Sequence, residues 1–92
     1  MIDTYPLVTI GVPTYNRANL LGRALNCIIN QDYQNIEVIV ADNCSPGNDF
    51  EKVIESYSHK IANLKYIKHL QNIGSISNFI YVLDQANGKY FM

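Results

Sequence analysis

Two polar stretches in this 92-residue chain hold the side chains best suited to binding a ligand. The first follows an apolar run at 8–12 and consists of Pro13, Thr14, Tyr15, Asn16 and Arg17. Thr14 and nearby backbone groups could bond a base edge, Tyr15 could stack on a flat ring, and Arg17 could neutralise a phosphate. Simpler roles stay open, with Thr14 shaping the loop, Tyr15 half-buried over the next helix and Arg17 solvated. Asn16 is more often a helix cap than a ligand.

The second polar stretch begins at Asp42 and Asn43, directly after an apolar run at 36–41. The Asp42 carboxylate could accept a hydrogen bond from a base N–H or a ribose hydroxyl, because both need an acceptor. Asp42 could equally cap its own turn, as Asp often does at such places. Both roles are open from spacing alone.

A third loop-to-helix junction contains Asn72, Gly74 and Asn78. The N-terminus of a helix suits an anion or a polar ligand edge. A plain turn with a cluster of capping side chains is the alternative.

Other chemistry-bearing residues do not assemble into a known motif. The chain has no glycine-rich dinucleotide or ATPase loop, and no Ser-His-Asp or Cys-His set can be assigned. His59 and His69 lack partners at metal spacing and are expected at the surface. Cys27 and Cys44 are expected to be reduced thiols rather than a disulfide.

Alternating strands and helices would position these side chains. Strands are predicted at 7–12, 36–41, 64–67 and 89–92, with helical patterns between them. The first strand should end at Pro13 or just before it, because proline has no N–H for the sheet. Such βα units predict a parallel sheet with right-handed crossovers, and ligands bind outside the carboxyl ends of its strands.

Each predicted helix has a candidate cap and an apolar stripe. The candidate caps are Asn16 or Asn19, then Asn48 with Glu51 in a capping box, then Ser75 or Ser77, with Gly88 as a left-handed cap at the end of the third helix. The inward stripes are expected to be Leu20, Leu21, Ala24, Leu25, Ile28 and Ile29, then Phe50, Val53, Ile54 and Tyr57, then Ile76, Phe79, Ile80, Leu83 and Ala86.

Composition limits the class of protein. The length suits one domain, and the net charge of −1 with 48% hydrophobic residues is ordinary for a soluble globular chain. The charge gives no reason to expect nucleic-acid binding. No apolar run approaches the roughly 20 residues of a membrane span, and no signal peptide is visible. The expected location is the cytoplasm, with the inner face of the membrane open for a longer parent.

Four segments taken together resemble the family-2 glycosyltransferases. They are residues 8–17, 42–45, 72–78 and 86–90, and they run in order over nearly the whole chain. The resemblance implies a three-layer, Rossmann-like α/β fold with a parallel sheet of order 3-2-1-4. Residues 1–92 would be the N-terminal, nucleotide-sugar-binding half of a glycosyltransferase A-type domain, cut off inside the fourth strand.

The same resemblance implies roles for individual residues. The loop at 13–15 would embrace the base of a nucleoside-diphosphate sugar, often uracil, Asp42 would bond that base, and residues 72–78 would close over the nucleotide. Two positions depart from the family pattern. Asn43 stands where many members carry a second Asp, and Ser77 stands where many carry Arg.

Catalytic parts of the family pattern are missing from residues 1–92. The D-x-D motif, which holds a divalent cation (Mg or Mn), follows the fourth strand, and the general base lies further on. A diphosphate leaves poorly unless its charge is stabilised, and the attacking hydroxyl needs a base. The resemblance implies that the intact parent transfers a sugar from a nucleoside-diphosphate donor, UDP-linked, to an acceptor hydroxyl with inversion, in cell-surface polysaccharide biosynthesis. This chain alone, with no catalytic or metal-binding residue, would bind at most the nucleotide.

Other readings remain. One is a nucleotide-binding module without catalysis, and another is a nucleotidyltransferase or a flavodoxin-like regulator. A nucleotidyltransferase would carry a glycine-rich, basic loop after the first strand, and a phosphoacceptor regulator would cluster acids at strand ends, where only Asp42 stands. Self-association is also expected, because an incomplete fourth strand leaves the edge of the first strand poorly covered.

Overall fold

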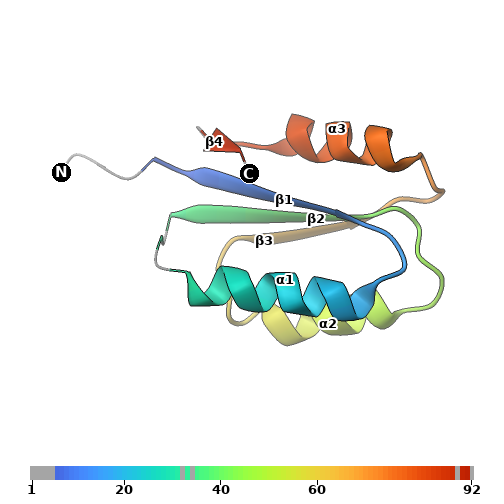
Figure 1. The fold of residues 1–92 in the computed structure, drawn as a ribbon, viewed down its shortest axis with the longest axis horizontal. Helices are drawn as coiled ribbons and strands as arrows, with labels where there is room; N and C mark the ends of the chain where they lie inside the picture. Colours follow the sequence, from blue (N-terminus) through green and yellow to red (C-terminus); the bar gives the residue numbers. More distant parts are fainter. Residues whose placement is uncertain (1–5, 32, 34, 89, 92) are drawn as a thin grey trace.

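A computed structural model of the chain describes residues 6–31, 33, 35–88 and 90–91. Strands and helices alternate along this part of the chain (Figure 1). They are β1 (Val8–Thr14), α1 (Ala18–Asn30), β2 (Ile36–Asp42), α2 (Asp49–Tyr57), β3 (Leu64–Lys68), α3 (Ser75–Gln85) and β4 (Tyr90–Phe91). All described strand pairs are parallel, and the sheet order β3-β2-β1-β4 confirms the predicted order.

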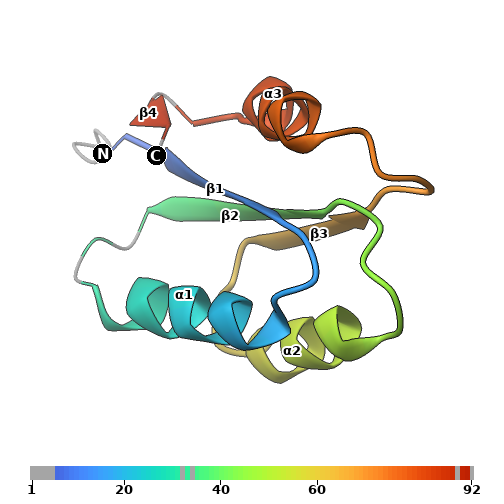
Figure 2. The same ribbon diagram turned by 45° about the vertical axis from the view of Figure 1, so that its right-hand side comes forward.

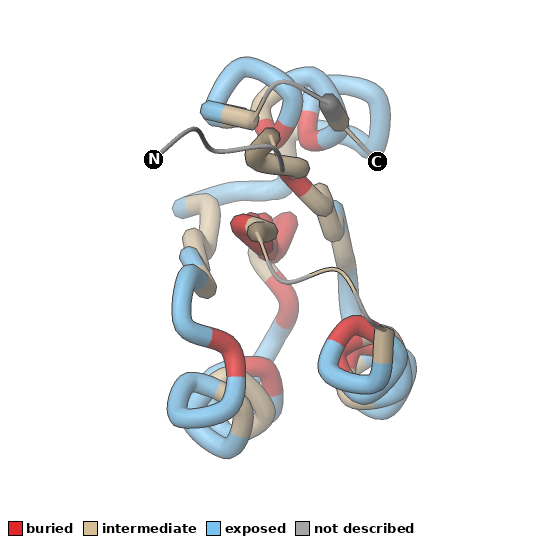
Figure 3. Tube along the Cα trace, turned by 90° about the vertical axis from the view of Figure 1, so that its left-hand side faces the viewer, coloured by how far each residue is buried: buried red, intermediate tan, exposed pale blue. Residues whose placement is uncertain are grey.

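The fold has three layers. Helices α1 and α2 cover one face of the sheet, and α3 covers the other (Figures 1 and 2). Buried residues are concentrated on the central strands and on the inward turns of the helices (Figure 3). This is the arrangement expected of a βα series with right-handed crossovers.

The larger core cluster lies between the sheet and helices α1 and α2. Its buried members are Leu21, Leu25, Ile28, Val38, Val40, Phe50 and Ile61. Val53, Ile54 and Tyr57 pack against it, so the predicted stripe of α2 is confirmed. The stripe of α1 is confirmed at its centre, whereas Leu20 and Ile29 at its margins are exposed.

The predicted inward face of α3 is wrong. Its apolar stripe points outward, with exposed fractions of 76% for Ile76 and 48% for Phe79, and Ile80 and Leu83 are also exposed. The buried residues of α3 are Asn78 and Val82. Polar contacts made by Asn78 with the sheet fix the rotation of the helix, so its most apolar side is not its inner side.

Gly11 on β1 explains how closely α3 approaches the sheet. A Cβ atom at Gly11 would lie 2.5 Å from Val82 Cγ1 and 2.6 Å from Phe91 Cζ. The missing side chain therefore leaves the space that Val82 and Phe91 occupy. Val82 joins Ile39 and Ala41 in a small second core cluster on this face.

Strand β1 continues through Pro13 to Thr14, beyond the predicted end. Along a strand, the backbone N–H and C=O groups of alternate residues point to the same neighbouring strand. The Val8 N–H and the Thr14 carbonyl both bond toward β2, so the backbone groups of Pro13 point to the opposite edge of β1. On that edge, the described pairing with β4 involves Val8 and Thr9 alone. The missing N–H of Pro13 therefore removes no bond to β2.

The predicted helix caps are largely wrong. In the described chain, none of the three N-cap residues, Arg17, Asn48 and Gly74, makes a side-chain capping bond. Asn48 stands at the predicted position without its capping-box bonds, and Ser75 lies inside α3. Asn16 instead adopts a left-handed conformation (φ 53°), which Asn tolerates better than most residues.

The end of α3 also differs from expectation. Its C-cap is Ala86 in an extended conformation, and Gly88 does not have a positive φ. Gly88 is instead required by close packing, because a Cβ there would lie 2.6 Å from the backbone nitrogen of Thr9.

Two further findings concern the described residues. None of their helices is long and apolar enough to cross a bilayer. Cys27, which is exposed, and Cys44, which is half-buried, are not bonded to one another.

Candidate functional site

Thr14 and Asp42 lie side by side at the carboxyl edge of the sheet. They are register partners on β1 and β2, and the Asn43 N–H donates to the Thr14 carbonyl at 2.9 Å. The loops at 15–17 and 43–48 both leave the sheet at this point. We call the residues 13–17 and 42–45 the carboxyl-edge site.

Ser45 joins the two loops of this site. Its hydroxyl accepts a hydrogen bond from the Asn16 N–H at 2.6 Å and donates to Asp42 Oδ1 at 2.5 Å. The Ser45 N–H also donates to Asp42 Oδ1, at 3.1 Å. Asp42 therefore does cap its own turn, and the same contacts hold the first loop over the second. The sequence analysis did not single out Ser45. An aspartate at the start of a turn-rich loop often accepts hydrogen bonds from nearby residues of that loop, and Ser45 follows Asp42 by three positions.

The second carboxylate oxygen of Asp42 has a weaker partner. The Tyr66 hydroxyl approaches Oδ2 at 3.4 Å. Burial, followed by the negative charges of Asp42 and Glu51, raises the pKa of Tyr66 well above its usual value, so this hydroxyl stays protonated as a donor. Asp42 has no exposed surface, so a ligand N–H can reach Oδ2 only when the surrounding loops move. Oδ2 retains acceptor capacity for such a group.

The exposed part of the site lies over the first loop. A hollow of about 370 Å³ is lined by residues that include Pro13, Thr14, Tyr15 and Arg17. Tyr15 is 48% exposed and also lines an adjoining hollow with Arg17 and Asn16. This surface presents an aromatic ring and a guanidinium to solvent, which suits a flat base and a phosphate.

The loop before α3 also reaches this edge. The Ile73 N–H donates to Asn43 Oδ1 at 2.8 Å, which brings the third polar stretch beside the second. Asn72 Oδ1 accepts the Gly74 N–H at 2.8 Å, as in the plain turn that was the alternative for this stretch. Asn72 and Gly74 are exposed, whereas the Asn43 amide oxygen already has this protein partner.

Asn78 is buried and faces the sheet. Its side-chain Nδ2 donates to the Ala41 carbonyl at 2.9 Å, and its Oδ1 lies 2.8 Å from His69 Nε2. The His69 ring also makes an edge-on contact with the Tyr81 ring, and the backbone N–H of His69 donates to the Asp42 carbonyl at 2.9 Å. The prediction that both histidines are surface residues is therefore wrong for His69, which is half-buried, and holds for exposed His59.

The described residues do not form a metal site of their own. Among them, no three His, Cys, Asp or Glu side chains gather closely enough to hold an ion. At the carboxyl-edge site, Asp42 Oδ1 is already occupied by Ser45. A separate cavity of about 170 Å³, bordered by Ile36, Lys60 and Asn63, lies at the opposite rim of the sheet.

The chain is similar to known proteins over nearly its whole length. The family described as Glycosyl transferase family 2 matches residues 9–92. The putative colanic acid biosynthesis glycosyl transferase WcaA of Escherichia coli is 48% identical over 86 residues, which are 92% of this chain and 30% of WcaA. A glycosyltransferase of Rickettsia bellii is 40% identical over 88 residues, and there the chain spans 12% of the relative's length.

Solved structures show the same fold. The mannosyltransferase PcManGT of Pyrobaculum calidifontis, in complex with GDP-Man and Mn²⁺, has a TM-score of 0.83 at 27% identity, over 95% of this chain and 26% of that one. TarS 1-349 of S. aureus, in complex with UDP-GlcNAc, has a TM-score of 0.83 at 31% identity, over 92% of this chain and 25% of TarS 1-349. The sheet order, the family match and these structures agree, and the chain belongs to glycosyltransferase family 2.

Proposed function

We propose that this chain is the nucleotide-sugar-binding part of an inverting glycosyltransferase that transfers a sugar to an acceptor hydroxyl. The observation that carries the proposal is the pairing of Thr14 with Asp42, which joins two polar loops at one edge of the sheet. Ligands of open α/β sheets bind at this edge. The structural neighbours with GDP-Man and UDP-GlcNAc support a nucleoside-diphosphate sugar as the donor class.

Each part of the carboxyl-edge site has a proposed role. The base lies in the hollow over residues 13–15, where Tyr15 stacks on it and backbone groups bond its edge. Arg17 faces the same hollow and pairs with the diphosphate. Asp42 Oδ2 accepts a base N–H once the loops part, and uracil is the proposed base.

The loop before α3 closes over the nucleotide in this proposal. Asn72 and Gly74 are exposed and lie next to the second loop through the Ile73–Asn43 bond. Asn43 and Asn78 act by holding this loop in place, because their amides contact Ile73, Ala41 and His69.

Catalysis is assigned to residues beyond this chain. A divalent cation would stabilise the charge that develops on the diphosphate leaving group. The parent would hold this cation and its general base outside residues 1–92, so the chain alone should bind nucleotide without transferring sugar. A cytoplasmic location for the parent is also proposed, and the free thiols Cys27 and Cys44 are compatible with a reducing compartment.

An amide NMR titration of the 92-residue chain with UDP, GDP and dTDP tests the binding site. We expect shifts at residues 13–17 and 42–45, strongest for one base. Arg17→Ala should weaken binding, whereas Arg23→Ala, a matched change at an exposed site on α1, should not. Shifts confined to the opposite rim, or equal effects of the two variants, would contradict the proposed site.

A longer parent protein tests the reaction. The expected result is transfer of a sugar from a UDP-, GDP- or dTDP-linked donor to an acceptor hydroxyl, with inversion of configuration at the anomeric carbon. Donor binding without transfer to any acceptor would instead support a binding module without catalysis.

A further inference from the structure

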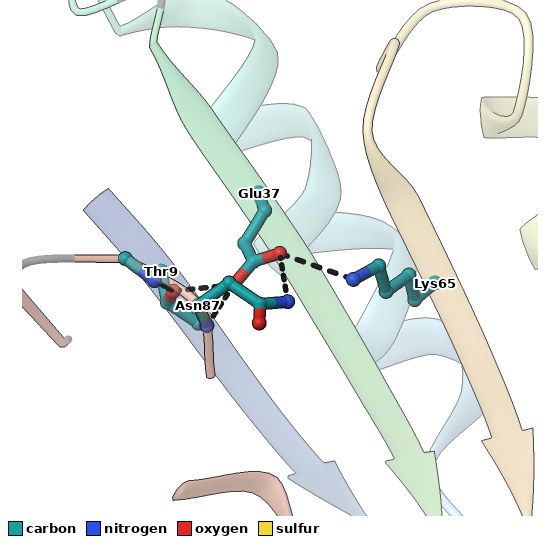
Figure 4. Close-up of polar contacts among 5 residues, drawn as sticks. Thr9, Glu37, Lys65 and Asn87 are labelled. Atoms are coloured by element: carbon teal, nitrogen blue, oxygen red, sulfur yellow. Dashed lines mark hydrogen bonds and ion pairs between the residues drawn. The ribbon is translucent and has the colours of Figure 1, made fainter. Parts of the chain in front are cut away.

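A second polar cluster lies near the opposite, amino end of the sheet, on the face covered by α3. Its centre is Glu37 of β2 (Figure 4). The Glu37 residue is only 1% exposed. The Thr9 hydroxyl and the Asn87 N–H both donate to Glu37 Oε1 at 2.6 Å. A charged carboxylate at a buried position needs such partners, because burial without them is costly.

The other oxygen of Glu37 is also paired. Lys65 Nζ lies 3.2 Å from Oε2, and the Asn87 side-chain Nδ2 lies 3.3 Å from it. The Gly88 N–H donates to Thr9 Oγ1 at 2.8 Å, so the Thr9 hydroxyl connects Gly88 to Glu37. Glu37 thus joins its own strand β2 and the two neighbouring strands, β1 and β3, to Asn87 between α3 and β4 (Figure 4).

The chain between α3 and β4 determines where β4 enters the sheet. The described pairing of β4 with β1 consists of Val8 with Tyr90 and Thr9 with Phe91. Two paired residues fix the register of a strand weakly, and a slip of one residue turns every side chain to the opposite face. Phe91 would then leave its place against Gly11 and Val82.

We propose that Glu37 is a positioning residue that sets the register of β4 on β1 by holding Asn87 and Gly88 against Thr9. Glu37 Oε1 accepts hydrogen bonds from the Thr9 hydroxyl on β1 and from the Asn87 N–H just before β4. These are the two segments that must be aligned for β4 to pair in this register. Lys65 is the lesser partner, because its side chain is 47% exposed and exposed ion pairs contribute little.

The register has a consequence at the far edge of the sheet. Strand β4 runs parallel to β1, toward the edge where Thr14 lies. Thr9 and Thr14 are five residues apart, or roughly 16 Å in a strand. By fixing this register, Glu37 would set how far along β1 toward the carboxyl-edge site β4 lies, and the effect of this distance on that site alone rests on the proposed function.

Amide hydrogen exchange followed by NMR tests the proposal without any nucleotide. Glu37→Met is close in size to glutamate but removes both acceptor oxygens, so the Thr9 hydroxyl and the Asn87 N–H lose their partner. We expect the exchange protection of Gly88 and Tyr90 to fall by about tenfold or more, while Val38 and Val40 in the centre of β2 keep theirs. Lys65→Met, which removes only the exposed ion pair, should change protection at Gly88 and Tyr90 by less than about threefold.

Thr9→Val provides a second, milder variant with nearly unchanged volume. It removes the hydroxyl that connects Gly88 to Glu37, and we expect the same local loss of protection. If Glu37→Met unfolds the chain, the Thr9→Val result decides. Unchanged protection of Gly88 and Tyr90, or an equal loss throughout β2 and α1, would overturn the positioning role. Because no ligand is added, failure of this test is distinguishable from failure of nucleotide binding.

Discussion

The backbone N–H of Asn43 donates to the carbonyl of Thr14 at 2.9 Å, at the last described bond between β2 and β1. Beyond this bond the two loops separate, and Ser45 rejoins them through the Asn16 N–H. The loops therefore form a closed ring of contacts over Asp42. This ring is closed at Ser45, which bonds both loops and makes the serine the first residue to test.

Ser45→Ala should loosen this ring. The change removes the hydroxyl that bonds both Asn16 and Asp42, and two bonds, one of them to a buried carboxylate, contribute roughly 1–3 kcal/mol to the free energy of unfolding. Urea denaturation measures the loss. Ser56→Ala is the matched control, because its hydroxyl bonds the Lys52 carbonyl on an exposed helix surface. Equal stabilities of the two variants would mean that the ring contributes nothing.

The fold was predictable because its signals are local. Apolar runs that end at polar loops identified β1, β2 and β3, and helical stripes identified α1 and α2. The chirality of parallel connections then limits the possible topologies. The pairing of Thr14 with Asp42 follows from these two facts, since carboxyl ends of parallel neighbours share an edge.

The rotation of α3 was not predictable from its pattern. Its outer stripe is more apolar than its inner side, where Asn78 bonds the Ala41 carbonyl and His69. These partners are 37 and 9 residues away, so no local window contains the contact that decides the rotation. The left-handed Asn16 is similar, because its N–H partner Ser45 is 29 residues away.

Glu37 was overlooked for a different reason. It interrupts an otherwise apolar run, and the interpretation of that run as a strand did not ask what the carboxylate would bind. A signal was present in the sequence, because Glu37 is the one charged residue in the predicted strand at 36–41. A lone acid inside a buried strand is expected to have a specific partner.

Replacing Gly11 and Gly22 by alanine should change the free energy of unfolding in opposite directions. Gly11→Ala places a methyl group 2.5 Å from Val82 and should lower the free energy of unfolding by roughly 1–3 kcal/mol through overpacking. Gly22→Ala lies inside α1 with no heavy atom within 4 Å of the new methyl, and should raise it by roughly 0.5–1 kcal/mol. Thermal or urea denaturation of both variants checks the signs. A neutral Gly11→Ala would contradict the close contact between α3 and β1.

Glu37 should make the stability of the chain depend on acid pH. Burial opposes its ionisation, but hydrogen bonds from Thr9, Asn87 and Lys65 outweigh it and lower the pKa of Glu37 from 4.5 to about 2. A carboxyl group whose pKa is lower in the folded state than in the unfolded state stabilises the fold at pH values above its unfolded-state pKa. This stabilisation by Glu37 is lost as the pH falls from about 4.5 to about 2. The shift corresponds to roughly 3 kcal/mol.

Urea denaturation between pH 2 and 6 measures this loss. The difference between the native chain and Glu37→Gln isolates the contribution of Glu37, because other carboxylates titrate in both. Lys65 is the charged group that contacts Glu37 among the described residues. Parallel pH profiles for the two proteins would show that Glu37 has an ordinary pKa.

The 92-residue chain should self-associate at high concentration. The described pairing of β4 stops at Thr9, so the far half of β1 presents an open edge, and α3 exposes Ile76, Phe79 and Ile80 beside it. Open strand edges and exposed apolar faces both favour contact with a second copy. Light scattering over a dilution series measures the association, and a monomer at every concentration would reject it.

Ile76→Ser should weaken association, whereas Leu70→Ser, at a fully exposed position outside α3, should leave it unchanged. If the two substitutions act equally, the contact does not involve the α3 face.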